Sequence, residues 1–171
     1  MFFLEFVVVE NCMHIRLIAI GKIKERFLQD GIAEYEKRLR PYVKLQIVEL
    51  ADEKRPVSAS APIEAAAIGK EGDRICAAIP DGSFVIALDI QGASWSSEEL
   101  AGALRQWELA GQNQITFVIG GDLGLSPPVL ARSDLRLSLS KMTFTHPMAR
   151  MLLLEQVYRA FRILRGEPYH K

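Results

Sequence analysis

The sequence predicts an α/β fold with a mainly parallel sheet that is covered by helices on both faces. Apolar runs of strand length alternate with helical patterns from Met13 to the end of the chain, which is the order expected of βα units. One run, FVIALDI at 84–90, is almost continuously apolar, as expected for a strand buried on both faces. With 171 residues, of which 49% are hydrophobic and 25% charged, the chain has the size and balance of one globular domain.

The first half of the chain is expected to form two strands and two helices. The first strand is closed by Gly21, and the helix after it has apolar residues at spacings of four, three and four before Pro41 ends it. An alternating apolar and polar run predicts the second strand, and a proline-flanked polar segment predicts a loop. The expected ranges are a strand at 14–20, a helix at 25–40, a strand at 43–50, a loop at 51–62 and a helix at 63–79.

The second half of the chain is expected to form three strands and three helices. Ser96 or Ser97 before Glu98 and Glu99 is a capping arrangement that starts one helix, and a serine followed by a first-turn proline starts another. The expected ranges are a strand at 84–90, a helix at 96–109, a strand at 114–120, a helix at 126–132, a strand at 135–140 and a long helix that begins at Pro147 and is ended by Gly166 and Pro168.

Two loops are expected at the carboxyl edge of the sheet, where open parallel sheets bind ligands. One is the glycine turn in ITFVIGGDLGL at 115–125, and the other is SKMTF at 140–144. The glycine turn lacks the lysine of a phosphate loop and has Asp122 where a phosphate would approach, which disfavours phosphate binding. Two interpretations stay open: a tight strand-to-helix turn with positive φ, and close backbone contact with a neutral or cationic ligand.

The charge balance gives no global sign of a nucleic-acid partner, because 21 Lys and Arg offset 21 Asp and Glu. Residues 141–171 carry six Lys and Arg against two Glu, and this surplus fits either phosphate contact or a solvated helix face. The two cysteines lack CxxC spacing, which fits a reducing cytoplasm. The three histidines have no Cys or His partner at ligand spacing, so no metal site is expected.

The first twelve residues are expected to lie outside the core fold. MFFLEFVVV is as apolar as a signal segment, but it lacks a basic region, contains Glu5 and precedes no small-residue cleavage site, so export is not expected. Met13 stands directly before a clear strand pattern. Residues 1–12 are therefore interpreted as an N-terminal extension, and residues 13–171 as a single domain.

Several motifs together resemble the RlmH family of ribosomal RNA large-subunit pseudouridine N3-methyltransferases, members of the SPOUT superfamily. These motifs are the glycine turn, the SKMTF loop, the EQVYRAFRI helix and the RGEPYHK end, and GKIKERF and GIAEYEKRL extend the resemblance back to Met13. The resemblance implies a Rossmann-like domain with a C-terminal trefoil knot that binds S-adenosylmethionine. It also implies a homodimer, with the long helix from Pro147 in the interface.

The resemblance also assigns a cofactor site to three segments at the carboxyl edge. Two residues depart from the family pattern: Asp122 stands where relatives have a small uncharged residue, and Thr145 replaces a proline before His146. The residues implied to contact the cofactor are Leu88, Gly120, Leu139, Ser140, Lys141, Met142, Thr143 and Phe144.

The implied reaction transfers a methyl group from S-adenosylmethionine to N3 of a pseudouridine in a stem-loop of 23S rRNA, on the assembled ribosome. His170 and Tyr169, with Arg150 as an electrostatic partner, are the candidates for RNA positioning or proton transfer. One alternative is a non-catalytic RNA-binding or ribosome-assembly factor. A nucleotide-dependent α/β enzyme is a weaker alternative, because the glycine fingerprint and the ribose-binding acidic residue are missing. We expect the protein to be cytoplasmic, without a membrane or metal partner.

Overall fold

The computed structural model describes residues 12–169, which form a five-stranded sheet in the order β2-β1-β4-β3-β5. All four strand pairings are parallel, so the α/β fold with a parallel sheet is confirmed. The strands are β1 (His14–Ile20), β2 (Lys44–Leu50), β3 (Phe84–Ser94), β4 (Gln114–Ile119) and β5 (Leu135–Ser138). The helices are α1 (Arg26–Leu39), α2 (Ala61–Ala78), α3 (Ser97–Leu109), α4 (Pro127–Arg132) and α5 (His146–Leu164).

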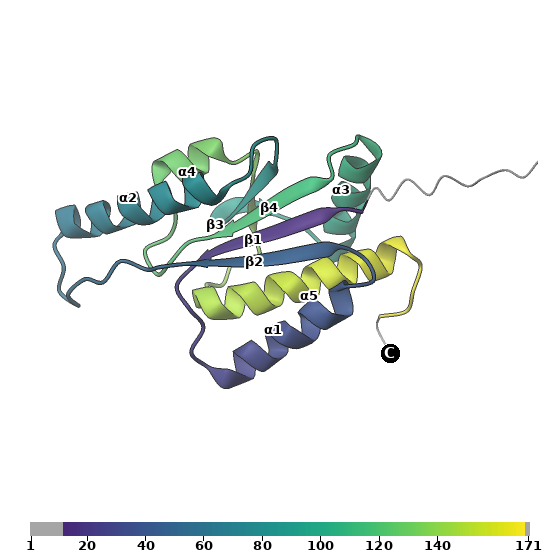
Figure 1. Ribbon diagram of the computed structural model, residues 1–171, viewed down its shortest axis with the longest axis horizontal. Helices are drawn as coiled ribbons and strands as arrows, with labels where there is room; N and C mark the ends of the chain where they lie inside the picture. Colours follow the sequence, from purple (N-terminus) through teal and green to yellow (C-terminus); the bar gives the residue numbers. More distant parts are fainter. Residues whose placement is uncertain (1–11, 170–171) are drawn as a thin grey trace, which may run out of the picture.

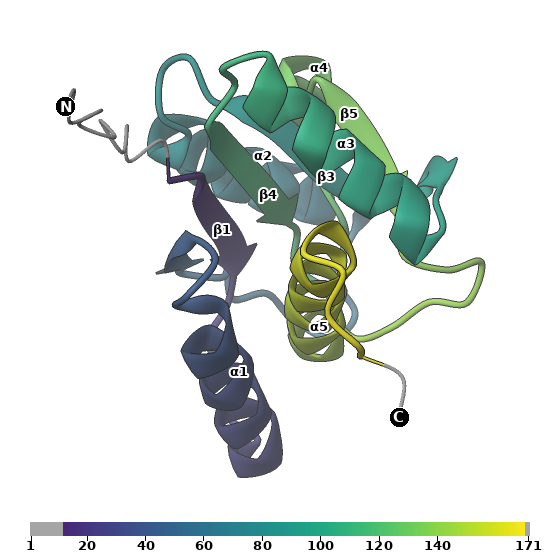
Figure 2. The same ribbon diagram turned by 90° about the vertical axis from the view of Figure 1, so that its right-hand side faces the viewer.

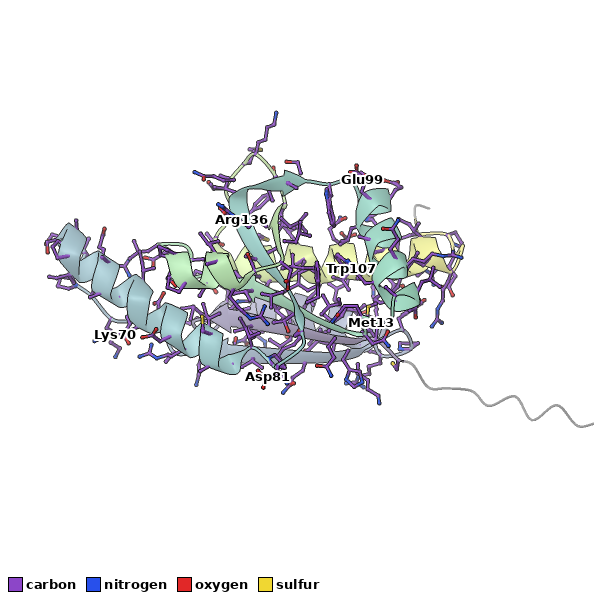
Figure 3. All side chains as sticks on the ribbon, turned by 90° about the horizontal axis from the view of Figure 1, so that it is seen from above. Met13, Lys70, Asp81, Glu99, Trp107 and Arg136 are labelled. Atoms are coloured by element: carbon purple, nitrogen blue, oxygen red, sulfur yellow. The ribbon has the colours of Figure 1, made fainter. Side chains whose placement is uncertain are left out.

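Helices cover both faces of the sheet, as the sequence predicted. Helices α2 and α4 lie on one face, and α1 and α5 lie on the other (Figure 1). Helix α5 packs between α1 and α3, so three helices share that second face (Figure 2). Lys70 on α2 and Trp107 on α3 lie toward opposite ends of the long axis (Figure 3).

Neighbouring residues of the central strands point to opposite faces and fill two separate cores. Leu17 and Phe117 contribute to the core under α1, α3 and α5, whereas Ile18 and Val118 contribute to the core under α2 and α4. All four side chains are fully buried. This double burial explains why residues 17–20 of β1 and 115–119 of β4 form nearly continuous apolar runs without the alternation of a half-exposed strand.

The strand order reverses between β1 and β4, which places a crevice at the carboxyl ends of these two strands. From β1 the chain crosses through α1 to β2 on one side, while β3 and β5 lie on the other side of β4. Crevices of this kind are the usual ligand sites of open parallel sheets. Gly21 follows β1 and Gly120 follows β4, so glycines stand on both sides of it.

The third strand differs from the expectation at its carboxyl end. It was predicted to end at residue 90 before a polar turn, but β3 continues to Ser94 after an irregularity, because Leu88 and Ala93 both pair with Leu137 of β5. A Cβ on Gly92 would lie 2.6 Å from the backbone of Arg136, so only glycine allows this close passage. Residues 89–92 are thereby pushed out of the ladder at the carboxyl edge.

The other predicted elements are confirmed within a few residues. Strand β1 has the predicted bounds, and β5 ends two residues earlier than expected, so that residues 139–145 form a loop into α5. Ser96 and Glu99 form the expected capping box of α3. The proposed extension at 1–12 lies outside the described residues except for Cys12, and stays a prediction.

Candidate functional site

A cavity of about 850 Å³ opens at the carboxyl ends of β3, β4 and β5; we call it the β3–β5 cavity. Its walls come from the end of β3, the glycine turn after β4, the loop between β5 and α5, and the start of α5. The two loops that the sequence placed at one edge therefore do meet. Residues that line it include Leu88, Asp89, Ile119, Gly120, Leu137, Leu139, Ser140, Phe144 and His146.

The glycines of the turn are needed by the protein's own backbone. A Cβ on Gly120 would lie 2.5 Å from the carbonyl oxygen of Gly124, and one on Gly121 would lie 3.2 Å from Oε2 of the buried Glu71. Gly124 has a φ of +85°, and a bridge joins it to Gly121. The tight-turn interpretation therefore accounts for all three glycines, while Gly120 and Gly124 still line the cavity.

The charged side chains of the β3–β5 cavity are acidic. Among the described residues no lysine or arginine lines it, whereas Glu25, Asp89 and Asp122 do. Asp89 is bonded to Arg136 of β5, with 2.7 Å between Nε and Oδ2, and Asp122 accepts a hydrogen bond of 2.5 Å from Arg55. This lining is unsuitable for a phosphate and compatible with a cationic or neutral ligand.

Seven of the eight residues that the resemblance assigned to cofactor binding line this cavity. These seven residues come from three segments that are distant in sequence. They are Leu88, Gly120, Leu139, Ser140, Met142, Thr143 and Phe144. The eighth, Lys141, is exposed and does not line it. Met142 and Phe144 are 74% and 44% exposed, which is unusual for large apolar residues and leaves their side chains open to a ligand.

A second cavity of about 1190 Å³ adjoins the first at the carboxyl ends of β1 and β2; we call it the β1–β2 cavity. It is lined largely by charged residues of the segments after these strands and of α2. Several interactions hold its loop. Arg55 bonds Asp122, the backbone N–H of Glu53 donates to Oε1 of Glu71 over 2.9 Å, and Arg74 of α2 donates to the carbonyl oxygen of Ala51 over 2.8 Å. Five residues line both cavities: Glu25, Gly121, Asp122, His146 and Pro147.

Arg150, a predicted catalytic candidate, lines neither cavity. It is 1% exposed, and its guanidinium donates to Oε1 of Glu49 at 2.9 Å and to the carbonyl oxygens of Ile20 and Gly21 at 2.5 and 2.8 Å. Burial lowers the pKa of Arg150 from its usual value, and Glu49 opposes that shift. The contacts of Arg150 therefore join the second turn of α5 to the carboxyl end of β1.

His146, the first residue of α5, is a site residue that the sequence did not identify. It lines both cavities, and its Nδ1 lies 3.4 Å from Nη2 of Arg150. Burial lowers the pKa of His146, and the Arg150 charge adds to this effect, so the ring is neutral at physiological pH. The only available sequence signal was its place at the start of the long helix, in a loop already expected at the edge.

Tyr169 lies away from both cavities, near the carboxyl end of α5. Its ring packs edge-on against Tyr158, with centroids 5.2 Å apart, and the guanidinium of Arg159 lies 4.1 Å from its centroid. Burial raises the pKa of Tyr169, which therefore keeps its proton at neutral pH. His170 lies outside the described residues. Within one chain the structure places Arg150 and Tyr169 apart, and the role of His170 stays a prediction.

Comparison with known protein families assigns this chain to one of them. Residues 13–170 match a family model described as "Predicted SPOUT methyltransferase". The chain belongs to the SPOUT methyltransferase family. A five-stranded parallel sheet with a ligand-sized cavity at its carboxyl edge agrees with that membership.

Relatives of this SPOUT chain share most of its length. A protein of Clostridium botulinum named "Ribosomal RNA large subunit methyltransferase H" is 56% identical, and one of Carboxydothermus hydrogenoformans with the same name is 53% identical. A relative from Methanoregula boonei, which is provisionally named as the same methyltransferase, is 61% identical. Each alignment covers 93% of this chain and 100% of the relative.

Solved structures share the fold at low sequence identity. A probable methylase family protein from Haemophilus influenzae has a TM-score of 0.50 at 18% identity, covering 89% of this chain and 66% of that chain. A probable methyltransferase from Bordetella pertussis has a TM-score of 0.50 at 12% identity, covering 89% and 98%. At these identities the likeness concerns the fold alone.

No helix within residues 12–169 is long and apolar enough to cross a membrane. The same residues contain no group of three or more His, Cys, Asp or Glu side chains that could hold a metal ion.

Proposed function

We propose that this SPOUT protein methylates N3 of a pseudouridine in a stem-loop of 23S rRNA, with S-adenosylmethionine as the methyl donor. The observation that carries the proposal is the β3–β5 cavity, where seven residues from three distant segments line one space. The names of the relatives, which are 53–61% identical over their full length, support the rRNA substrate. The proposed modification occurs on the assembled ribosome in the cytoplasm.

The lining of the β3–β5 cavity fits S-adenosylmethionine chemically. Apolar residues such as Leu88 and Leu137 offer surface for the adenine, and backbone groups of the glycine turn and of residues 139–144 offer hydrogen bonds. The acidic side chains at its rim favour a ligand with a sulfonium and an ammonium group. When bound, this cofactor supplies an electrophilic methyl group. Residues of the cavity would hold it in place, so that alignment supplies much of the rate enhancement.

The proposal includes a trefoil knot in the C-terminal part of the chain. The family resemblance implies the knot, and sequence periodicity alone would never suggest one. In support, the glycine turn, the loop at 139–145 and the start of α5 all contribute to one cavity.

The proposal also includes a homodimer that uses α5. This helix has 19 residues, or about 28 Å of length, and Tyr169 lies near the end opposite the cavities. Tyr169 of one chain therefore lies far from that chain's own cavities, which supports a site completed by a second copy. The positive surplus of residues 141–171 would supply phosphate contacts that a chain of zero net charge otherwise lacks.

Calorimetry with S-adenosylmethionine and with NAD tests the proposed cofactor. We expect binding of S-adenosylmethionine and none of NAD, whereas a nucleotide-dependent enzyme would reverse this and an assembly factor would bind neither. The substrate is tested by incubating the protein with ribosomes that lack the modification and with naked 23S rRNA, followed by mass spectrometry of the fragments. A methyl group on any other atom, or none on either substrate, would refute the proposed reaction.

A further inference from the structure

The two cavities meet at a boundary where a target base would approach the cofactor. The five boundary residues are shared by both linings, so a base entering from the β1–β2 cavity reaches the β3–β5 cavity past them. The N3–H of a pseudouridine must lose its proton before N3 can accept a methyl group. The resulting negative charge spreads onto the two carbonyl oxygens beside N3, and hydrogen-bond donors aimed at these oxygens stabilise it.

Among the side chains of this boundary, His146 is suited to stabilise that charge. Gly121 and Pro147 have no polar side chain. Glu25 and Asp122 are carboxylates, which accept hydrogen bonds when ionised and repel an anion. The imidazole of His146 has an N–H that can donate.

Two neighbours fix the position of the His146 ring. A Cβ on Gly21 would lie 3.3 Å from Cε1 of His146, so the ring packs directly on the glycine that follows β1. On its other side Nδ1 faces Nη2 of Arg150 at 3.4 Å, the longest of the contacts of this Nη2. A guanidinium has donors and no acceptor, so this neighbour disfavours a proton on Nδ1. The neutral ring therefore carries its proton on Nε2, which forms no hydrogen bond among the described residues.

We infer that His146 is a catalytic residue whose Nε2–H donates a hydrogen bond to a carbonyl oxygen of the target base. This inference rests on the proposed function and names the group that stabilises the base anion. In the balanced reaction the N3 proton goes to water, the S–CH₃ bond breaks as the N3–CH₃ bond forms, and the sulfonium becomes a neutral thioether. His146 keeps its own proton throughout, and Arg150 is a positioning residue that holds the tautomer.

The charges around His146 agree with this role. Burial and the Arg150 charge lower the pKa of His146, whereas Asp122, Asp52 and Glu25 act in the opposite direction. The charge of Asp122 is in turn partly neutralised by Arg55. The outcome is a neutral imidazole near neutral pH, and neutral imidazoles serve as electrophiles for developing oxyanions in other enzymes.

Two variants separate a donor from a proton acceptor. His146→Gln keeps an N–H donor of similar reach, whereas His146→Leu removes it and keeps an apolar side chain. We expect kcat for rRNA methylation to fall about 100- to 1,000-fold in His146→Leu and less than about tenfold in His146→Gln. Dissociation constants for S-adenosylmethionine, measured by calorimetry, should stay within about threefold and show that both variants are folded.

The pH dependence gives a second readout. If the N3 proton goes to water, the kcat profiles of the wild type and His146→Gln run parallel. If His146 were the base, the wild type would show an ionisation that His146→Gln lacks. Parallel profiles support the inference, and a lost ionisation overturns it.

The tautomer of His146 can be tested without measuring the activity of any variant. In the ¹⁵N NMR spectrum of the wild-type protein, assigned by comparison with His146→Gln, we expect a protonated Nε2 and an unprotonated Nδ1 near neutral pH. A proton on Nδ1 overturns the inference, as does an active His146→Leu or a His146→Gln that is as impaired as His146→Leu. An inactive wild-type protein would refute the proposed function instead, so the two failures are distinguishable.

Discussion

The two cavities lie side by side at one sheet edge but are built in different ways. The glycine turn of the β3–β5 cavity is held by backbone contacts, such as the 3.1 Å hydrogen bond that the N–H of Gly124 donates to the carbonyl oxygen of Gly121. The loop of the β1–β2 cavity is held by charged side chains, such as the pair of Arg55 and Asp122. Close backbone packing does not depend on the salt concentration, whereas dissolved salt screens exposed ion pairs and weakens them. The site therefore has a fixed binding surface beside an adjustable one, and His146 lines both.

The largest effect is expected from Arg150→Met, which breaks the buried contacts that join α5 to the carboxyl end of β1. The variant leaves the carbonyl oxygens of Ile20 and Gly21 without their buried donor and removes the partner of Glu49. We expect a loss of about 3–5 kcal/mol in the free energy of unfolding, measured by urea titration. Arg26→Met is the control, because that side chain is 91% exposed and its loss should cost under about 0.5 kcal/mol. Equal effects of the two variants would contradict a structural role for Arg150.

Gly120→Ala tests the close backbone packing of the glycine turn in the β3–β5 cavity. Its Cβ would meet the Gly124 carbonyl at 2.5 Å, so the turn must shift, and we expect a loss of about 1–3 kcal/mol by urea titration. The matched control is Gly102→Ala within α3, where a Cβ meets nothing within 4 Å. This control should stabilise the protein by about 0.5–1 kcal/mol, because alanine favours a helix more than glycine does. A neutral Gly120→Ala would show that the turn is loose.

The difference between the two regions also explains what the sequence could predict. Strand β1 was predicted with its observed bounds because a mainly apolar run of strand length ends at a glycine, which is local information. The irregularity of β3 was missed because it depends on how Gly92 passes over Arg136, a residue from another part of the chain. Local chemistry thus predicted the elements, while long-range packing set their ends.

The candidate site shows the same limit. The cavity was predicted because two loops follow parallel strands and therefore lie at the same edge of the sheet, and the family resemblance added Leu88 and Leu139 to these loops. Arg150 looked like a functional cation in the sequence, but its carbonyl partner in Ile20 lies 130 residues earlier in the chain. His146 was overlooked for the same reason, because its contact with Gly21 appears only when α5 packs against the end of β1. A pattern along the chain cannot distinguish a buried cation from one that meets a ligand.

A smaller effect of opposite sign is expected from Glu71→Gln at the floor of the β1–β2 cavity. Glu71 is 5% exposed, and burial raises its pKa above the usual value of 4.5, with Asp122 adding to the shift. A raised carboxyl pKa stabilises the fold below the usual value, and that stabilisation is lost as pH rises through the folded value. Glutamine keeps an oxygen for the Glu53 N–H without the charge, so Tm should rise by about 2–4 °C at pH 7.

The gain from Glu71→Gln should shrink toward zero as the pH is lowered to 4, where the wild-type carboxyl is protonated. Asp73→Asn, on the exposed face of the same helix, is the control for removing one negative charge and should change Tm by less than about 2 °C. A gain for Glu71→Gln that is independent of pH would mean that burial of the charge is not its cause.

The smallest effect is expected from Asp122→Asn, which removes the ion pair between the two cavities. Arg55 donates to Asp122 and lowers the pKa of this carboxyl, so the pair stabilises the fold above the usual value of 3.8 and is lost as pH falls through the folded value. Because the Asp122 side chain is 66% exposed, we expect Tm to fall by at most about 2 °C at pH 7 in low salt. The difference in Tm should vanish in 1 M salt, where exposed charges are screened.

Arg55→Gln should lower Tm by the same amount as Asp122→Asn. The double variant should be no less stable than either single variant, because both substitutions remove the same interaction. An effect of Asp122→Asn that persists in high salt would show that this side chain holds the glycine turn by packing. The two cavities would then not differ in the way their loops are held.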